Sequence, residues 1–161
     1  ALQSYKKIQH IVVQGTDAAF ITLGDPCTYS TAWALIKHFM AQDPDIEVDI
    51  VPGVTSYTAA AARTLIPLVE GNEFLSVVSS NDSLEKIEKI IDASETVIFL
   101  KTYRYRSRLF QLLEQKGLID QCIYIQRCGL KGEIIMRNIN NLPADPEYFS
   151  MIILKKPAAQ P

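Results

Sequence analysis

Two short segments of this sequence combine glycine and proline with side chains that could take part in chemistry. Residues 24–26 (GDP) place the carboxylate of Asp25 at a tight turn, where it could meet a cation or accept a proton. Residues 52–53 (PG) are followed by the hydroxyls of Thr55 and Ser56 at the expected start of a helix. Glycine lets a ligand approach the backbone, and a helix start offers unpaired amides. Each motif alone is also typical of an ordinary turn or helix cap.

A basic segment indicates a second kind of chemistry. Residues 101–108 (KTYRYRSR) hold four basic groups and no acid, although the net charge of the whole chain is -2. The negative balance argues against general nucleic-acid binding, so a small anionic ligand is the more natural partner. Guanidinium groups pair bidentately with carboxylates, which makes Arg104, Arg106 and Arg108 candidate ligands for an acidic substrate. A solvated helix face is the alternative interpretation.

Several other classes of site are excluded by motifs that the sequence lacks. It contains no GxxxxGK[ST] phosphate loop, no GxGxxG dinucleotide signature and no GxSxG nucleophile turn. The cysteines and histidines lie too far apart for a zinc pattern, so we expect no metal site. A hydrophobic fraction of 48%, without an apolar run near the ~20 residues of a membrane span, is typical of a globular protein outside the membrane. We expect a cytoplasmic protein with reduced thiols at Cys27, Cys122 and Cys128.

The elements that must position these groups alternate between strand and helix, which predicts an α/β fold. In an open parallel sheet, ligands gather at the carboxyl ends of the strands, where both turns are expected. The expected strands cover residues 18–23, 47–51, 74–79, 96–101, 122–127, 133–137 and 149–155. The expected helices cover residues 31–41, 55–64, 84–92 and 107–116, and a weaker helical pattern covers residues 1–14.

The pattern also predicts two domains. Residues 66–72 carry a proline and a glycine without clear periodicity, which marks a boundary between a first α/β domain (1–68) and a second (69–156), followed by a disordered tail (157–161). The last two strands lack a full helix between them, which predicts an antiparallel edge and a mixed sheet in the second domain. The first domain supplies only two clear strands, so we expect residues outside this sequence, or another chain, to complete its sheet.

Three segments taken together resemble the tetrapyrrole (corrin/porphyrin) methylases. Members of that family carry a GDP turn after a strand, then P-G-[VI]-[TS]-[SA] opening an alanine-rich helix that ends in I-P-L. Residues 24–26, 52–56 and 66–68 match these motifs in order and spacing. Family members begin with a strand and a G-x-G-P-G-D-P segment that this sequence does not contain. The resemblance implies two α/β domains, the first one incomplete here, with S-adenosylmethionine (SAM) between them.

Further segments resemble one branch of the family, the precorrin-2 or cobalt-factor II C20-methyltransferases of cobalamin and porphyrin biosynthesis. They are residues 22–31 (TLGDPCTYST), 99–101 (FLK), 124–130 (YIQRCGL) with the following Glu133, and 148–154 (YFSMIIL). This resemblance implies methyl transfer from SAM to a meso carbon of a reduced tetrapyrrole. It also implies a full-length homodimer with neither a nucleic-acid partner nor a protein-bound metal.

The resemblance assigns roles to individual residues. Asp25 contacts the positively charged donor or acts as the general base, and we favour the base because the methylated carbon must lose a proton. Tyr29 orients Asp25, lies against the macrocycle, or simply packs at a helix start. The implied SAM contacts are Leu23, Gly24, Asp25, Thr28, Thr55, Ser56, Lys101, Cys128 and Gly129, and the implied substrate ligands are Arg104, Arg106 and Arg108.

Other functions stay open at this point. A different ring carbon, a modified protein residue or ribosomal RNA could be the methyl acceptor, although the negative charge disfavours RNA. Alternatively, the chain could be a non-catalytic oligomerisation or binding piece whose exposed sheet edge pairs with a second chain. The motifs do not distinguish a cobalt-containing substrate from a cobalt-free one.

Overall fold

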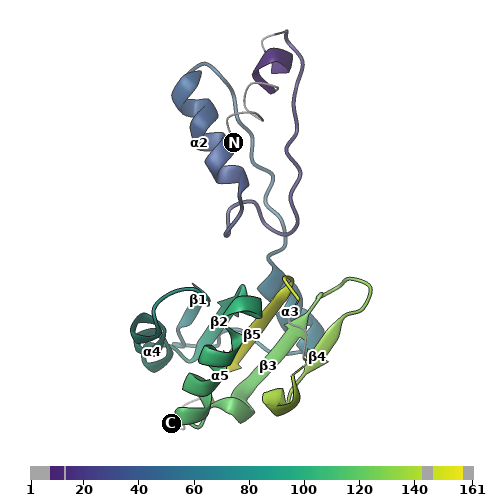
Figure 1. Cartoon of the computed structure of the whole chain (residues 1–161). Helices are drawn as coiled ribbons and strands as arrows, with labels where there is room; N and C mark the ends of the chain where they lie inside the picture. Colours follow the sequence, from purple (N-terminus) through teal and green to yellow (C-terminus); the bar gives the residue numbers. More distant parts are fainter. Residues whose placement is uncertain (1–7, 13, 143–146, 158–161) are drawn as a thin grey trace. The chain divides into compact units, whose positions relative to one another are not determined.

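The computed structural model describes residues 8–12, 14–142 and 147–157. The chain divides into two compact units, Ala1–Ser56 and Tyr57–Pro161. Figure 1 shows the helices and strands of each unit along the chain. Of the predicted helix 1–14, residues 8–12 are helical and residues 1–7 and 13 lie outside the described part. Most of the predicted tail, residues 158–161, also lies outside it.

The first unit contains the helix α2 (Ala32–Gln42), close to its predicted range. The hydroxyl of Ser30 accepts a hydrogen bond from the amide of Ala32 at 3.1 Å, so it satisfies one of the free amides at the helix start. Leu35 and Phe39 are the buried large side chains of α2, and they pack against Ile8 and Ile46. This small apolar cluster holds the helix against the segments beside it.

The two strands predicted in the first unit, at residues 18–23 and 47–51, are not formed. Both are extended segments without a strand ladder (Figure 1). Their apolar side chains face solvent, with Ile21 92% and Val51 81% exposed. The strand prediction was wrong because an apolar run becomes a strand only when neighbouring strands accept its backbone hydrogen bonds. The first unit does not provide those neighbours to the two segments.

The second unit is built on a five-stranded sheet in the order β1-β2-β5-β3-β4. The first two strands run parallel, whereas β5 is antiparallel to both β2 and β3, and β4 is antiparallel to β3. The predicted mixed sheet is therefore confirmed, and each strand lies close to its expected range. The bounds are β1 (Leu75–Ser79), β2 (Thr96–Leu100), β3 (Cys122–Gln126), β4 (Ile134–Met136) and β5 (Ser150–Lys155).

The predicted position of the last strand was wrong. We expected the last two strands to form an antiparallel edge, but β5 lies in the middle of the sheet and β4 alone forms that edge. Met151, Ile152, Ile153 and Leu154 are all buried, so β5 is apolar on both of its faces. A strand with two apolar faces is most stable in the middle of a sheet, where helices cover it from both sides.

Three helices cover the two faces of this sheet (Figure 1). Phe99 and Tyr124 face a cluster that contains the buried side chains of α4 and α5, whereas Ile98 and Ile153 face Ala60 of α3. The alternation of side chains along each strand thus produces a helix–sheet–helix sandwich. The helices are α3 (Ser56–Thr64), α4 (Leu84–Ala93) and α5 (Arg106–Gln115), with short 3-10 helices η1 (Thr102–Arg104), η2 (Ile119–Gln121) and η3 (Ile139–Asn141).

The helix α3 ends in a tight turn just before the predicted domain boundary. The amide of Ile66 donates to the carbonyl of Ala61 at 3.1 Å, and Leu65 between them adopts a left-handed φ of 55°. Ile66 and Leu68 then pack beside α3 on the sheet of the second unit. The division into compact units reflects this packing of α3. The predicted domain ranges, 1–68 and 69–156, stay a prediction.

Candidate functional site

The carboxylate of Asp25 joins the two turns that the sequence singled out. One oxygen, Oδ2, accepts from the amide of Gly53 at 2.9 Å. The other, Oδ1, accepts from the amide of Cys27 at 2.8 Å and from the hydroxyl of Thr28 at 3.4 Å. These hydrogen bonds lower the pKa of Asp25, the amide of Gly53 contributing most. The side chain is therefore ionised at neutral pH and crosslinks residues 24–28 to the second turn.

The backbones of the two turns approach each other closely. A Cβ atom added at Gly53 would lie 2.3 Å from the carbonyl oxygen of Gly24, so no larger residue fits without a backbone shift. Gly24 itself adopts a φ of 76°, which favours glycine. The two glycines are therefore required by geometry, and they bring backbone groups of both turns to one place on the first unit.

Polar and apolar residues flank the two turns in the sequence. Leu23 is 73% exposed immediately before the first turn, whereas Thr28 and Thr55 are half-buried. Tyr29 is half exposed and has a φ of 52°, an uncommon backbone conformation for an aromatic residue. Ser56 is exposed and begins α3. The predicted ligand residues of the first unit therefore lie in or next to turns whose backbone is exposed.

The remaining predicted cofactor residues belong to the second unit. Lys101 is exposed, directly follows β2 and has a left-handed φ of 57°. Cys128 and Gly129 lie in the loop after β3, where the amide of Gly129 donates to a carboxylate oxygen of Glu133 at 2.8 Å. Partial burial, followed by the charge of Glu133, raises the pKa of the Cys128 thiol. That thiol is therefore protonated at neutral pH and is not an activated nucleophile.

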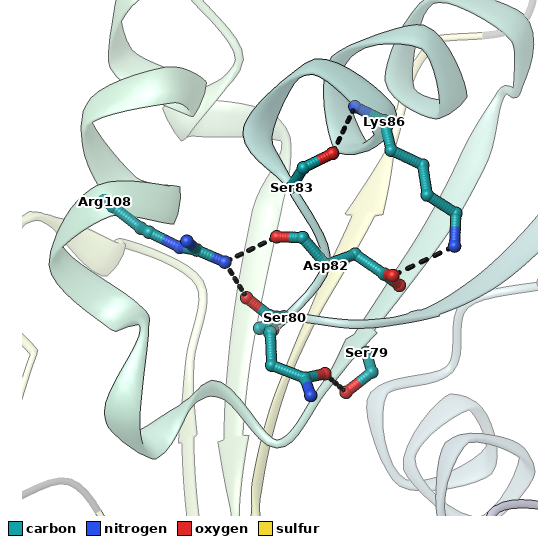
Figure 2. Close-up of polar contacts among 7 residues, drawn as sticks. Ser79, Ser80, Asp82, Ser83, Lys86 and Arg108 are labelled. Atoms are coloured by element: carbon teal, nitrogen blue, oxygen red, sulfur yellow. Dashed lines mark hydrogen bonds and ion pairs between the residues drawn. The ribbon is translucent and has the colours of Figure 1, made fainter.

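Arg108 is bound to the protein's own backbone. Its Nη2 atom donates to the carbonyls of Ser80 at 2.9 Å and Asp82 at 2.5 Å, which places it against the loop that follows β1 (Figure 2). Its guanidinium also lies 4.5 Å from the ring centroid of Tyr105. At the same loop, Ser83 caps α4 through the amide of Lys86. Arg108 thus links the start of α5 to the β1–α4 loop.

The other two predicted substrate ligands have different surroundings. Arg104 is exposed, and its guanidinium carbon lies 5.3 Å from the ring centroid of Tyr103. Arg106 lies near the hydroxyl of Tyr124, where its charge offsets part of the rise that burial causes in the pKa of that tyrosine. The basic segment therefore does not present three equivalent arginines, and Arg104 is the most accessible of them.

Two structural features are absent from the described part of the chain. The described residues contain no cluster of three or more histidine, cysteine or acidic side chains that could hold a metal ion. Within the same part of the chain, none of the helices has both the length and the apolar character needed to cross a membrane.

The sequence profile of the tetrapyrrole (corrin/porphyrin) methylases matches residues 5–141, most of the chain. The chain belongs to this family. The match includes both turns, α3 and the strands up to β4, so the family assignment and the paired turns concern the same residues. The family predicted from the sequence motifs is confirmed.

Two curated relatives share the branch that the sequence motifs indicated. The cobalt-precorrin-2 C(20)-methyltransferase of Salmonella typhimurium is 31% identical over 147 residues, which cover 90% of this chain and 61% of the relative. A probable cobalt-precorrin-2 C(20)-methyltransferase of Methanocaldococcus jannaschii is 30% identical over 156 residues, which cover 92% of this chain and 63% of the relative. The chain thus spans about three fifths of the length of these relatives.

Solved structures of the same family show the same fold at lower identity. The cobalt precorrin-4 methyltransferase CbiF superposes with a TM-score of 0.73 at 16% identity, over 94% of this chain and 69% of CbiF. A uroporphyrin-III C-methyltransferase of Thermus thermophilus, described as complexed with S-adenyl homocysteine, gives a TM-score of 0.58 at 18% identity, over 82% of this chain and 62% of that one. The predicted α/β fold of the tetrapyrrole methylase type, with its mixed sheet, is confirmed.

Sequence reasoning missed the contacts that hold this family member's loops in place. It identified Asp25 but not its bond to Gly53, and it noted Glu133 only as part of a motif. The partner of Glu133 is Arg63, which is distant in sequence and lies in no recognisable motif. No sequence signal pairs these two residues, because a salt bridge across the fold depends on the packing of α3 against the sheet.

Proposed function

We propose that this chain is the greater part of a SAM-dependent methyltransferase that methylates C20 of precorrin-2 or cobalt-factor II in cobalamin biosynthesis. The observation that carries the proposal is the 31% identity to the Salmonella typhimurium cobalt-precorrin-2 C(20)-methyltransferase over 90% of the chain. The junction of the two turns supports it, because the matching motifs coincide with accessible, closely spaced backbone groups. We further propose a cytoplasmic enzyme that is homodimeric at full length.

The proposed cofactor is SAM, which supplies a methyl group on a positively charged sulfur. Exposed carbonyls and amides of the two turns and the hydroxyls of Thr28 and Thr55 are suited to the polar edge of a nucleoside and to an amino-acid group. S-Adenyl homocysteine bound to the Thermus thermophilus relative supports the same class of ligand. The proposed contacts are Leu23, Gly24, Asp25, Thr28, Thr55, Ser56, Lys101, Cys128 and Gly129.

In the proposed reaction, the bond between sulfur and the methyl carbon breaks as a bond from C20 to that carbon forms, and C20 then loses its proton. The protein's main contribution is to hold the two reactants near contact distance and in line. A base must take up the proton. Asp25 is ionised and so can accept it, but its lowered pKa makes it a weak base.

Two substitutions separate the proposed roles of Asp25 in the full-length protein. Asp25→Asn keeps an oxygen that can accept from Gly53, whereas Asp25→Ala removes it. If Asp25 is the base, both variants lose turnover while S-adenosylhomocysteine (SAH) affinity falls less. If Asp25 only joins the turns, Asp25→Asn retains most turnover. Tyr29 is the second proposed catalytic residue, and Tyr29→Phe tests its hydroxyl in the same assay.

The proposed substrate carries acetate and propionate carboxylates that can pair with arginine. Arg104 and Arg106 are proposed ligands on this basis, and Arg108 is proposed with a second role in holding the loop that follows β1. Charge removal at Arg104 should raise the substrate KM, and the rise should shrink as salt increases. An unchanged KM at low salt contradicts this assignment.

The decisive experiment is calorimetric titration of SAH into this chain and into a version extended at its N-terminus to the length of the relatives. Binding by both places the cofactor contacts within the present residues. Binding by the extended form alone assigns part of the site to the added segment. Absence of binding in both contradicts the methyltransferase proposal. Transfer of labelled methyl from SAM to precorrin-2, with a panel of other reduced tetrapyrroles, then tests C20 against other ring carbons.

One observation favours a second candidate function. Phe20, Ile21, Leu23 and Val51 all expose apolar surface on the first unit, which a partner chain could cover. An oligomerisation piece without catalysis would show a concentration-dependent mass and no SAH binding. The same two measurements on this chain separate the candidates.

A further inference from the structure

Glu133 makes contacts with two segments that are distant in sequence. Both of its carboxylate oxygens lie 3.2 Å from Nε of Arg63 on α3, and Oε2 also forms an ion pair with the Nη2 atom of that arginine. Arg63 is 59% exposed, whereas the side chain of Glu133 is only 16% exposed. The bidentate geometry fixes the orientation of the carboxylate more firmly than a single contact with lysine would.

The same carboxylate also holds the loop after β3. Its Oε1 atom accepts the amide of Gly129 at 2.8 Å. This loop contains left-handed residues in close succession, with φ values of 52° at Arg127, 71° at Gly129 and 83° at Gly132. Such conformations persist when surrounding contacts determine them, and the bond from Gly129 to Glu133 is one of those contacts.

A second arginine also connects α3 to the same hairpin. Nη2 of Arg137, just after β4, donates to the carbonyl of Thr64 at the end of α3 at 2.7 Å. The last turn of α3 and the hairpin of β3 and β4 are thus joined twice, by Arg63 to Glu133 and by Arg137 to Thr64. Only the first of these contacts reaches the loop that carries Cys128 and Gly129.

The lowered pKa of Glu133 keeps its carboxylate charged for the contacts with Arg63 and Gly129. The guanidinium of Arg63, followed by the amide of Gly129, lowers the pKa of Glu133 to about 2. The carboxylate therefore remains ionised throughout the neutral range. The thiol of the neighbouring Cys128 also interacts with Glu133, and partial burial keeps that thiol protonated.

We propose that Glu133 is a positioning residue for the cofactor, which orients the Cys128–Gly129 backbone by accepting the Gly129 amide while Arg63 anchors it to α3. This inference rests on the proposed function, because Cys128 and Gly129 are proposed SAM contacts. The hydrogen bond from Gly129 positions the loop, and the ion pair with Arg63 attaches Glu133 to α3.

Three single variants test these roles by SAH calorimetry on the full chain, together with hydrogen exchange of the Gly129 amide. Glu133→Ala should weaken SAH binding by about tenfold, as expected when a charge-assisted hydrogen bond is lost, and should expose the Gly129 amide to exchange. Glu133→Gln should stay within about threefold of the wild type, because its amide oxygen can still accept from Gly129. The SAH affinity of Arg63→Ala should lie between the affinities of these two variants.

A charge swap separates positioning from simple attachment. The double variant Arg63→Glu with Glu133→Arg can rebuild the ion pair and recover thermal stability, but arginine has no acceptor for the Gly129 amide. We expect a recovered Tm with SAH affinity still reduced to the level of Glu133→Ala. Recovery of both properties would mean that Glu133 serves only as a structural ion-pair partner, which overturns the proposal.

The exposed pair of Glu85 and Lys89 on α4 provides a matched control, with side chains 77% and 74% exposed. Glu85→Gln should leave both SAH affinity and Gly129 exchange unchanged. Unchanged Gly129 exchange or SAH affinity in Glu133→Ala overturns the positioning role. Absence of SAH binding by the wild-type chain instead counts against the cofactor role of this chain, and the exchange data still decide whether Glu133 holds the loop.

Discussion

The two units of this chain use the same local pattern with different results. In both, an apolar run leads into a tight turn and then a helix. In the second unit the runs become strands of a five-stranded sheet with buried faces. In the first unit the equivalent runs stay extended and exposed, although the turns and α2 form as expected.

This difference separates two kinds of structural information. A turn such as residues 24–26 is favoured locally by glycine, proline and a carboxylate that accepts the nearby amide of Cys27. A strand needs neighbours for its backbone groups and cover for its side chains. The bonds within a turn are thus local, whereas the pairing of the two turns through Asp25 and Gly53 already joins residues distant in sequence. The second unit shows what a complete sheet adds.

The largest expected effect is in the core of the second unit. Phe99 is fully buried, and Phe99→Ala should destabilise this unit by about 4 kcal/mol through lost burial and the cavity left behind. This loss of stability is measured by urea unfolding monitored by circular dichroism. Ile21→Ala, at a position 92% exposed in the first unit, is the control and should change stability by less than about 0.5 kcal/mol. Equal effects at the two sites would contradict the contrast between the units.

The close approach of the two turns predicts the next effect. Gly53→Ala should destabilise the first unit by about 2 kcal/mol, because the added Cβ meets the carbonyl of Gly24. Trp33, the one tryptophan of the chain, lies on α2, and its fluorescence reports unfolding of this unit. Val54→Ala removes an exposed side chain beside the same turn and should leave the transition unchanged. A wild-type unfolding transition in Gly53→Ala would show that the close contact of the two turns is not required for stability.

A smaller effect of opposite sign is expected at the end of α3. Leu65 is 89% exposed and left-handed, so its side chain packs little while its backbone is strained. Leu65→Gly should therefore stabilise the second unit by about 1 kcal/mol. Leu65→Ala retains the Cβ and should have little effect. Destabilisation by Leu65→Gly would indicate that the exposed side chain makes a contact that this chain alone lacks.

The smallest expected effect is the loss of the bond between Asp25 and Gly53 at low pH. The pKa of Asp25 lies below its ordinary value of 3.8, so the bond between the turns is fully present above 3.8 and is lost only as pH falls through the lowered value. The chemical shift of the Gly53 amide, followed from neutral to acid pH, should stay constant until below 3.8. In Asp25→Asn the same shift should show no such titration. A midpoint above 3.8 would mean that Gly53 does not stabilise the carboxylate.

Much of the fold and part of the site could be predicted from the sequence. Its periodicity located the five strands and the helices of the second unit, and its motifs identified the family together with Gly24, Asp25 and Gly53. The pairing of residues remote in sequence could not be predicted. The substrate role of Arg108 stays a prediction, but its bonds to the carbonyls of Ser80 and Asp82 were not foreseen, because they depend on how α5 packs beside that loop.

By itself, the sequence determined the family, the mixed α/β class and the residues of the two turns, since turn chemistry and hydrophobic periodicity are local properties. Only the tertiary structure decided that β5 lies in the middle of the sheet, that Asp25 bonds Gly53 and that Glu133 connects Arg63 to Gly129. Each of these depends on which surfaces are buried together. Burial is a property of the assembled chain, because a strand, a carboxylate or an arginine acquires its partners only when distant segments pack.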